Sequence, residues 1–297
     1  MEKRGSSYIY VAFVVLLWSS TAAVGKLLLV DLEPIILLFI INLLATFALF
    51  TIVLLQGKIR LIPLFKIRDY LTFSYMGFLG VFMYTLLLFE ALKIMSAQEA
   101  FILNYLWPIM VVIFSAVILG EKLTTRKIIG VIFSFLGVFI IITGGDISSL
   151  NYSNLTGSLY VLLAAVSYGL FSVMGKKLNY DGYLSMMFYY FFGTIFSIVP
   201  VFVQASFPRL TLTQIVGVLW LGVFANGIAF VLWFQALKYG DTTLMSNIVF
   251  LTPFLSLVYG FLLLGENIIV TSVIGLTLIV IGILVQSIKD PSVLITH

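Results

Sequence analysis

The side chains best suited to binding chemistry in this chain are aromatic and amide groups set in apolar surroundings. One run reads Asn104-Tyr105-Leu106-Trp107-Pro108 and lies well inside a long apolar segment. Tyr105 and Trp107 would provide a wall of rings with polar ends, which suits an apolar or aromatic solute. Pro108 lacks a backbone donor and should weaken a helix there, leaving a carbonyl for another partner. The run therefore predicts a binding cavity, with ordinary helix packing or a belt of interfacial aromatic residues as the alternatives.

Two carboxylates and three amides also lie in or near apolar segments. Glu90 and Glu99 could exchange protons or bind a substrate ammonium, because ionisable groups at such depth are functional candidates. A charged helix end paired near Lys93 is the simpler interpretation of both. The amides are Asn226, Gln235 and Asn247. Such groups face a cavity or bond to a neighbouring helix, because lipid cannot satisfy them.

The residues needed for catalysis are missing from the sequence. There is no cysteine, and the one histidine, His297, is the last residue. The pattern H-E-x-x-H, a mid-segment aspartate pair and a Gly-Lys-Ser/Thr phosphate loop are all absent from the sequence. We therefore expect no enzyme activity, no metal and no cofactor. Lys and Arg are spread over short loops, so no nucleic-acid partner is expected, and no charged ring typical of a channel is visible.

The elements that carry these residues must be membrane-spanning helices. Hydrophobic residues make up 62% of the 297 and charged residues 9%, which excludes a water-soluble domain. A span needs roughly 20 mainly apolar residues, and runs this long are helices rather than barrel strands. Ten such segments are predicted, at residues 8–30, 34–56, 70–91, 96–118, 126–145, 157–178, 183–205, 213–236, 242–263 and 269–288. The fold class is an all-α integral membrane protein.

The distribution of positive charge orients these spans. The first resembles a signal peptide, with Lys3 and Arg4 before an apolar run, but its length predicts that it is retained. With a cytoplasmic N-terminus, thirteen Lys and Arg lie inside, and only Lys26, Lys93 and Arg209 lie outside. This asymmetry places both termini in the cytoplasm.

The two halves of the chain are related in sequence. Residues 89–93 read Phe-Glu-Ala-Leu-Lys and residues 234–238 read Phe-Gln-Ala-Leu-Lys, an offset of 145. At this offset Pro108 matches Pro253, and the dipeptide at 120–121, Gly-Glu, matches that at 265–266. At an offset of 150, Trp18 matches Tyr168 and the Gly-Lys at 25–26 matches that at 175–176. We predict two five-helix repeats, residues 1–150 and 151–297. Because each holds an odd number of spans, the second must be inserted in the opposite orientation to the first, which is the inverted repeat that alternating-access transporters use.

Ten spans in two halves, with Gly-Glu after the fourth and ninth, resemble the drug/metabolite transporter superfamily and its EamA-type branch. The run Asn104–Pro108 is similar to the signature of bacterial aromatic amino acid exporters. The resemblance implies a secondary transporter that exports amino acids, with aromatic ones favoured, across the bacterial inner membrane. A broad exporter of drugs or organic cations is the alternative, because an aromatic cavity also suits cation–π contacts.

The same resemblance implies which residues line the cavity. In the aromatic exporters, tyrosines of the third span and an aromatic of the sixth do so, and Tyr84 and Tyr168 occupy those positions here. Trp18 is the repeat equivalent of Tyr168. The predicted substrate-binding set is Trp18, Tyr84, Asn104, Tyr105, Trp107, Tyr168, Asn226 and Asn247, with Glu90 and Glu99 as coupling candidates and Pro108 and Pro253 as hinges.

The expected partners are a small-molecule substrate and the lipid bilayer. Glycines at 130, 137, 275 and 282 lie along one side of the fifth and tenth spans, where small residues permit close helix packing. These helices would support either the fold or a homodimer, so a monomer and a homodimer are both compatible with the sequence.

Overall fold

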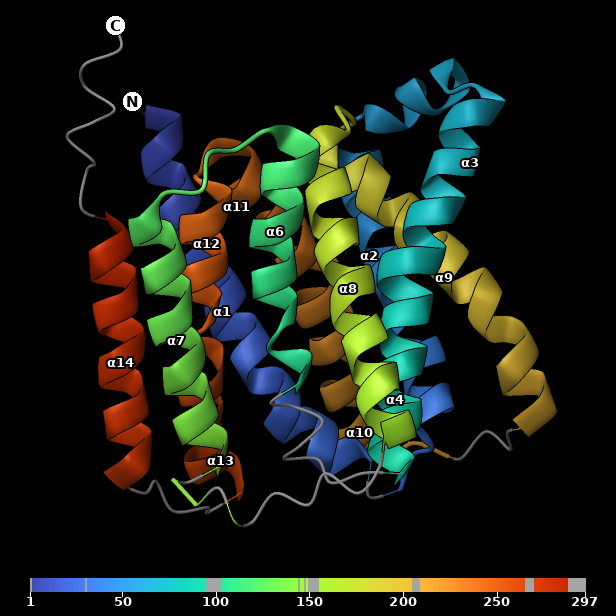
Figure 1. Cartoon of the computed structure of the whole chain (residues 1–297). Coiled ribbons are helices and arrows are strands. Elements are labelled where there is room, and N and C mark those ends of the chain that lie inside the picture. Colours follow the sequence, from blue (N-terminus) through green and yellow to red (C-terminus); the bar gives the residue numbers. More distant parts are fainter. Residues whose placement is uncertain are drawn as a thin grey trace, which may run out of the picture.

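The computed structural model describes residues 2–29, 31–94, 103–143, 145–146, 148, 155–204, 209–264 and 270–287. Over these residues the chain is helical and contains no strand, so the all-α prediction is confirmed for them. The helices stand side by side in one bundle (Figure 1). The start of α1 and the end of α14 lie at the same end of it (Figure 1).

The first half of the chain contributes α1 (Glu2–Leu28), α2 (Pro34–Leu55), η1 (Lys58–Leu64), α3 (Ile67–Met76), η2 (Gly77–Met83), α4 (Tyr84–Ile94), α6 (Trp107–Leu119) and α7 (Thr125–Thr143). The second half contributes α8 (Leu155–Lys177), α9 (Gly182–Gln204), α10 (Leu212–Leu219), η4 (Trp220–Ile228), α11 (Ala229–Tyr239), α12 (Thr242–Val249), α13 (Thr252–Leu264) and α14 (Val270–Ser287). Here η1 is a 3₁₀ helix, and η2 and η4 are π-helical stretches inside longer helices.

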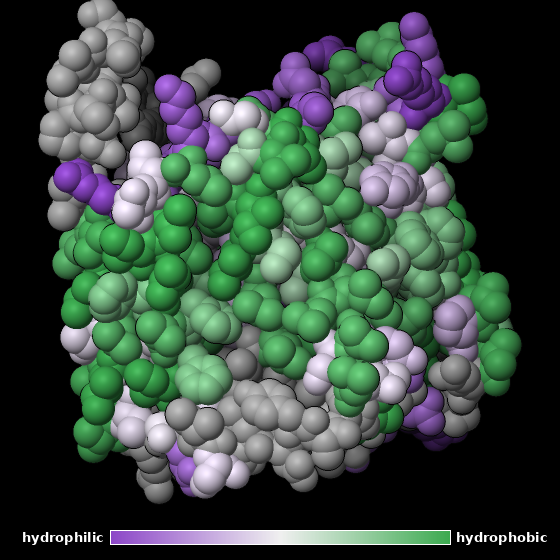
Figure 2. Space-filling model, viewed as in Figure 1, coloured by the Kyte–Doolittle hydropathy of each residue, from purple (hydrophilic) through white to green (hydrophobic). Residues whose placement is uncertain are grey.

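The lateral surface of the bundle is apolar, as a lipid environment requires. Side chains such as Leu55, Val117 and Phe202 are largely exposed. An apolar surface this extensive would be unfavourable in contact with water. Figure 2 shows apolar side chains over the side of the bundle and hydrophilic ones gathered at the end that carries η1 and the start of α3.

Seven helical segments among the described residues are long and apolar enough to cross a membrane, and Trp107–Leu119 and Val273–Val285 are shorter apolar helices. Each of the ten predicted segments overlaps a helix. The chain is thus a multi-pass membrane protein.

The π-helical stretches occur at equivalent places in the two halves. At the offset of 145, Gly77 and Met83, which bound η2, correspond to Gly222 and Ile228 in η4. A π-helix leaves carbonyls without their usual i+4 donors, and such stretches are rare and frequent at functional sites. Their repetition means that the equivalent helix of each half is interrupted at equivalent residues.

Helices α7 and α14 pack along each other through the predicted glycines. A Cβ at Gly137 would lie against the carbonyl oxygen of Gly275 and 3.0 Å from the backbone nitrogen of Ile279. A Cβ at Gly282 would lie 2.5 Å from the carbonyl oxygen of Gly130. The glycines thus allow these two helices, one from each half, to pack closely.

Gly137→Ala is therefore expected to destabilise the protein, because the methyl group meets backbone that cannot rotate away. Overpacking of this kind costs roughly 1–3 kcal/mol, measurable as a lower thermal unfolding midpoint in detergent. Gly25→Ala is the matched control, since a Cβ there meets nothing within 4 Å. Equal midpoints for the two variants would show that close packing of α7 on α14 is not required.

Candidate functional site

Each half contains a helix that is interrupted near the centre of the bundle. In the first half, Tyr105 and Leu106 form a turn directly before α6 begins at Trp107. In the second half, Phe250 and Leu251 form a turn between α12 and α13. The two turns are equivalent at the offset of 145. Broken helices at membrane depth are tolerated only where protein or a cavity surrounds the free backbone, and they mark binding sites in transporters.

The two prolines occupy the first turn of the helix that follows each interruption. Pro108 is the second residue of α6 and Pro253 the second of α13. An N–H in the first turn has no partner within the helix, so proline is tolerated there. The sequence predicted a weakened helix at Pro108. The structure instead shows the helix starting at Trp107, with the interruption at Tyr105 and Leu106.

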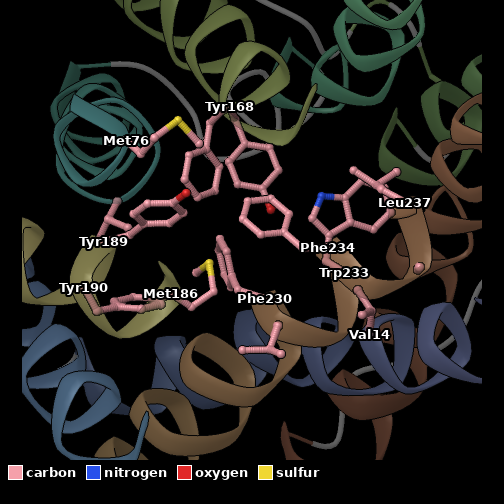
Figure 3. Close-up of a cluster of buried hydrophobic side chains, with 14 of the residues drawn as sticks. Val14, Met76, Tyr168, Met186, Tyr189, Tyr190, Phe230, Trp233, Phe234 and Leu237 are labelled. Atoms are coloured by element: carbon pink, nitrogen blue, oxygen red, sulfur yellow. The ribbon is translucent and has the colours of Figure 1, made fainter. Parts of the chain in front are cut away.

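Rings from four helices meet next to the first interruption. The indole of Trp18 on α1 has its ring centroid 5.9 Å from that of Trp107 and 6.2 Å from that of Tyr168 on α8. From α11, Phe230 lies at 5.3 Å and Trp233 at 5.8 Å from Trp18 by the same measure. Figure 3 shows Phe230 and Trp233 reaching from α11 toward Tyr168. These five rings and Tyr84, whose ring centroid is 4.7 Å from that of Tyr168, are called the aromatic cluster below.

Hydrogen bonds fix the orientation of two of the three tryptophans in this cluster. Trp18 donates its indole N–H to the carbonyl of Ala225 at 3.0 Å. Ala225 belongs to η4, so the π-helical stretch supplies the acceptor. Trp233 donates its indole N–H to Ser172 Oγ at 3.1 Å. Both indoles thus have defined partners, which is what buried tryptophan requires.

Two polar atoms of the site have no partner among the described residues. These are the hydroxyl of Tyr168 and the side-chain oxygen of Asn104. Tyr168 is 2% exposed and Asn104 is 6% exposed. The amide nitrogen of Asn104 donates to Tyr84 OH at 3.4 Å, so its oxygen is the free end. Leaving such a group buried and unpaired costs about 1–3 kcal/mol, so each calls for a partner in another state.

The site as described carries no formal charge. None of the residues joined by these ring contacts and hydrogen bonds is Asp, Glu, Lys or Arg. Groups of three or more His, Asp or Glu that could hold a metal do not occur among the described residues. The site therefore offers rings, hydroxyls and an amide to a ligand, which is the equipment for recognising an amphipathic solute.

The structure brings together four of the predicted residues, Trp18, Tyr84, Trp107 and Tyr168, and places Asn104 beside them. Tyr105 follows Asn104 in the chain but packs against a second apolar cluster around Val112 and Phe250.

The remaining predicted residues lie elsewhere. Asn226 donates to the carbonyl of Leu221 at 2.8 Å and accepts from Tyr190 OH at 3.3 Å. Its side chain therefore bonds to the backbone of η4 and to the neighbouring helix α9. Asn247 is fully buried in α12. Glu90 is half-buried on α4, and Glu99 lies outside the described residues.

Sequence reasoning missed Phe230 and Trp233. Their repeat equivalents at the offset of 145 are Thr85 and Leu88, so the internal repeat gave no sign of them. The available signal was their spacing of three residues, which places both rings on one face of a helix.

Comparison with known proteins agrees with this architecture. The EamA-like transporter family matches the chain twice, over residues 5–143 and 155–288. A solved crystal structure of a protein that is 23% identical superposes with a TM-score of 0.85 over 96% of this chain and 97% of that one, which shows the fold alone.

Relatives of known sequence are also transporters. An uncharacterized transporter of Clostridium kluyveri is 27% identical over 96% of this chain and 93% of its own length. The uncharacterized transporter YoaV of Bacillus subtilis is 26% identical over 92% of this chain and 94% of its own. The aromatic amino acid exporter YddG of Ancylobacter novellus is 29% identical, over 61% of this chain and 63% of its own length. With both halves matched by the same family, this chain belongs to the EamA-like transporter family.

Proposed function

We propose that this protein is a secondary transporter that exports amino acids, with aromatic ones favoured, across the bacterial inner membrane by alternating access. The observation that carries the proposal is the aromatic cluster, which lies beside an interrupted helix and, together with the adjoining Asn104, presents two buried polar atoms that have no partner among the described residues. A solute with an aromatic side chain and a polar head group would satisfy both features at once.

Alternating access would follow from ten spans arranged as two inverted repeats, residues 1–150 and 151–297. Three observations support that arrangement: the double family match, the equivalent interruptions at Tyr105–Leu106 and Phe250–Leu251, and the equivalent π-helical stretches. Two halves of one design can exchange conformations, which moves the opening from one side of the membrane to the other. Pro108 and Pro253 would limit helical continuity at the hinges, and both termini would be cytoplasmic.

The absence of formal charge from the described site favours a cargo without net charge. An ion moved into this apolar cluster would lose its hydration with no counter-ion to replace it. A zwitterion balances its own charges, and its ammonium and carboxylate can bond to the Asn104 oxygen and the Tyr168 hydroxyl. The relative named as an aromatic amino acid exporter is consistent with this choice. Export of drugs or organic cations is the second candidate, favoured by the number of rings available for cation–π contact.

Counterflow of radiolabelled tryptophan, phenylalanine or tyrosine into proteoliposomes preloaded with the same amino acid tests the proposal. Saturable exchange that unlabelled aromatic amino acids compete for is expected. Saturable exchange of an organic cation or an aliphatic amino acid, with none of the aromatic ones, would overturn the substrate assignment.

Glu90→Gln and Glu99→Gln test proton coupling. If the pH dependence of exchange is unaltered in both variants, neither carboxylate takes part in coupling.

Tyr168→Phe provides the sharpest site variant. Its hydroxyl has no partner among the described residues, so removing it should leave the unfolding midpoint unchanged or raise it. If the hydroxyl bonds to the substrate, the half-saturating concentration for exchange should rise roughly tenfold, the value of one buried hydrogen bond. Tyr189→Phe, on α9 and also buried, is the control for loss of a tyrosine hydroxyl. Equal affinities for both variants would place the head group elsewhere.

A further inference from the structure

Among the described residues, three ion pairs join the two halves of the chain at one end of the bundle. Lys58 pairs with Asp181 at 2.6 Å, Lys127 with Asp241 at 2.6 Å, and Lys176 with Glu121 at 2.9 Å. In each pair one residue comes from the first half and the other from the second. This is the end that carries η1 and the start of α1, and that the positive charges predict to be cytoplasmic (Figure 1).

Two of these pairs converge on the N-terminus of α12. Lys176 Nζ donates to Glu121 Oε1, and also to Thr242 Oγ1 at 2.6 Å. The Thr242 hydroxyl in turn donates to Glu121 Oε1 at 2.5 Å. One residue earlier, Asp241 caps α12 by accepting from the Leu244 N–H at 2.9 Å while its other oxygen accepts from Lys127. The segment between α6 and α7, with the first turn of α7, therefore clamps the start of α12 against the end of α8.

The contacts at the start of α12 hold a helix that connects this end of the bundle with the site. Helix α12 runs from the clamp to the interruption at Phe250 and Leu251, so it is the half-helix that leads from this end toward the centre. Its residues Thr242 to Asn247 are all buried. A path from this end to the site along α12 would require α12 to separate from the first half, which breaks the clamp.

Two side chains on α12 indicate where water would enter. Thr243 and Ser246 are fully buried, and their hydroxyls have no hydrogen-bond partner among the described residues. Buried hydroxyls are normally paired, so a pair of unpartnered ones on one short helix needs a reason. Hydration in a second conformation supplies that reason, because both would gain water when α12 moves away.

The burial of the ion pairs suits them to stabilise the conformation in which α12 packs against the first half of the chain. The side chains of Lys176 and Glu121 are 17% and 21% exposed, so their attraction is screened less than that of surface charges. Losing one partner would leave the other partly buried and uncompensated. In the sequence Glu121 is marked only as part of the repeated Gly-Glu dipeptide, whereas the structure pairs it with Lys176 in the other half of the chain.

We propose that Glu121, Lys176 and Thr242, with Lys127 and Asp241 beside them, form a lock between the halves that keeps the cytoplasmic side of the transport path closed. The lock rests on the proposed transport function, since it controls access to the same site. It assigns to these residues a positioning role and no contact with the substrate.

The test uses the natural absence of cysteine from the sequence. Ser246→Cys introduces a single buried thiol, whose reaction with a charged, membrane-impermeant methanethiosulfonate is followed in inside-out membrane vesicles. Slow labelling is expected in this parent. Lys176→Met and Glu121→Gln should each raise the labelling rate roughly fivefold or more, the size of an ordinary coupling between two states. The exchanged pair, Lys176→Glu with Glu121→Lys, should return the rate toward that of the parent.

Lys238→Met is the matched control, because Lys238 is exposed in the last turn of α11 at the same end. Lock variants that label no faster than this control would overturn the proposal. If Lys176→Met does not fold, Thr242→Val removes the bridging hydroxyl without changing charge, and a smaller increase is expected. Thr243→Cys repeats the measurement at a second buried position.

Labelling needs no substrate, so the two proposals fail separately. A rate that is independent of Glu121 and Lys176 in a protein that still exchanges aromatic amino acids overturns the lock alone. A rate that depends on both residues in a protein that exchanges no solute overturns the transport function alone.

Discussion

Trp107→Ala is expected to lower the exchange of aromatic amino acids at least about a hundredfold, measured as the maximal exchange rate divided by the half-saturating substrate concentration. The indole contacts Trp18, Tyr168 and Trp233, with ring centroids 4.8 to 5.9 Å apart. Removing it opens a space in the centre of the cluster and releases the rings around it. Initial rates of counterflow in proteoliposomes, normalised to reconstituted protein, measure the effect.

Truncating a buried tryptophan also lowers stability, by roughly 3–5 kcal/mol, so a second variant must separate binding from folding. Trp107→Phe keeps a ring in the same place and should retain measurable exchange, with weaker affinity. Phe202→Ala, on the exposed face of α9, is the control for loss of an aromatic group that faces lipid. Exchange by a folded Trp107→Ala protein at the rate of the Phe202→Ala control would remove Trp107 from the site.

Asn104→Asp is expected to give the second large effect and to decide between the candidate cargoes. The change is nearly isosteric but places a carboxylate where the described site has no positive group. An ionised carboxylate without a partner is costly to bury, and the ammonium of a zwitterion cannot neutralise it, because that ammonium is already balanced by the carboxylate of the same molecule. Exchange of aromatic amino acids should therefore fall by a factor of about ten or more.

The same carboxylate would attract a monovalent organic cation. Counterflow of such a cation should appear, or increase, in Asn104→Asp, while Asn104→Ala loses amino acid exchange without gaining cation exchange. If the unsubstituted protein exchanges cations well and Asn104→Asp does not change the ratio of the two cargoes, the argument from neutrality is wrong. Asn42→Asp, which alters a buried asparagine of α2, is the control for a new carboxylate elsewhere in the bundle.

The local sequence was sufficient to predict the helices. A run of apolar residues about as long as the hydrocarbon core has one stable conformation in lipid, because every backbone group must bond within the segment. The predicted limits 34–56 and 183–205 accordingly match Pro34–Leu55 and Gly182–Gln204 to within a residue. The same reasoning could not place the interruption at Tyr105 and Leu106, because it depends on how the neighbouring helices pack.

The candidate site was predictable in part. Trp18, Trp107 and Tyr168 could be named because a motif or the internal repeat marked them. Trp233 could not, since an aromatic residue in an apolar helix faces lipid and protein with equal ease until its neighbours are known. Asn226 shows the opposite error, because its polarity led to the prediction that it lines the cavity. Its partners, Leu221 and Tyr190, lie in or against a π-helical stretch that no sequence pattern predicted.

By itself the sequence determined that this protein lives in a membrane, which segments are helical, and that its halves share one design, because hydrophobic length and repeated residues are local properties. Tertiary structure decided which rings meet, which polar atoms have no partner among the residues described, and that Glu121 pairs with Lys176. Those features join residues as many as 215 positions apart, from Trp18 to Trp233. They exist only once the helices have packed, because a side chain gains its partner from a neighbour in space and not from its neighbours in the chain.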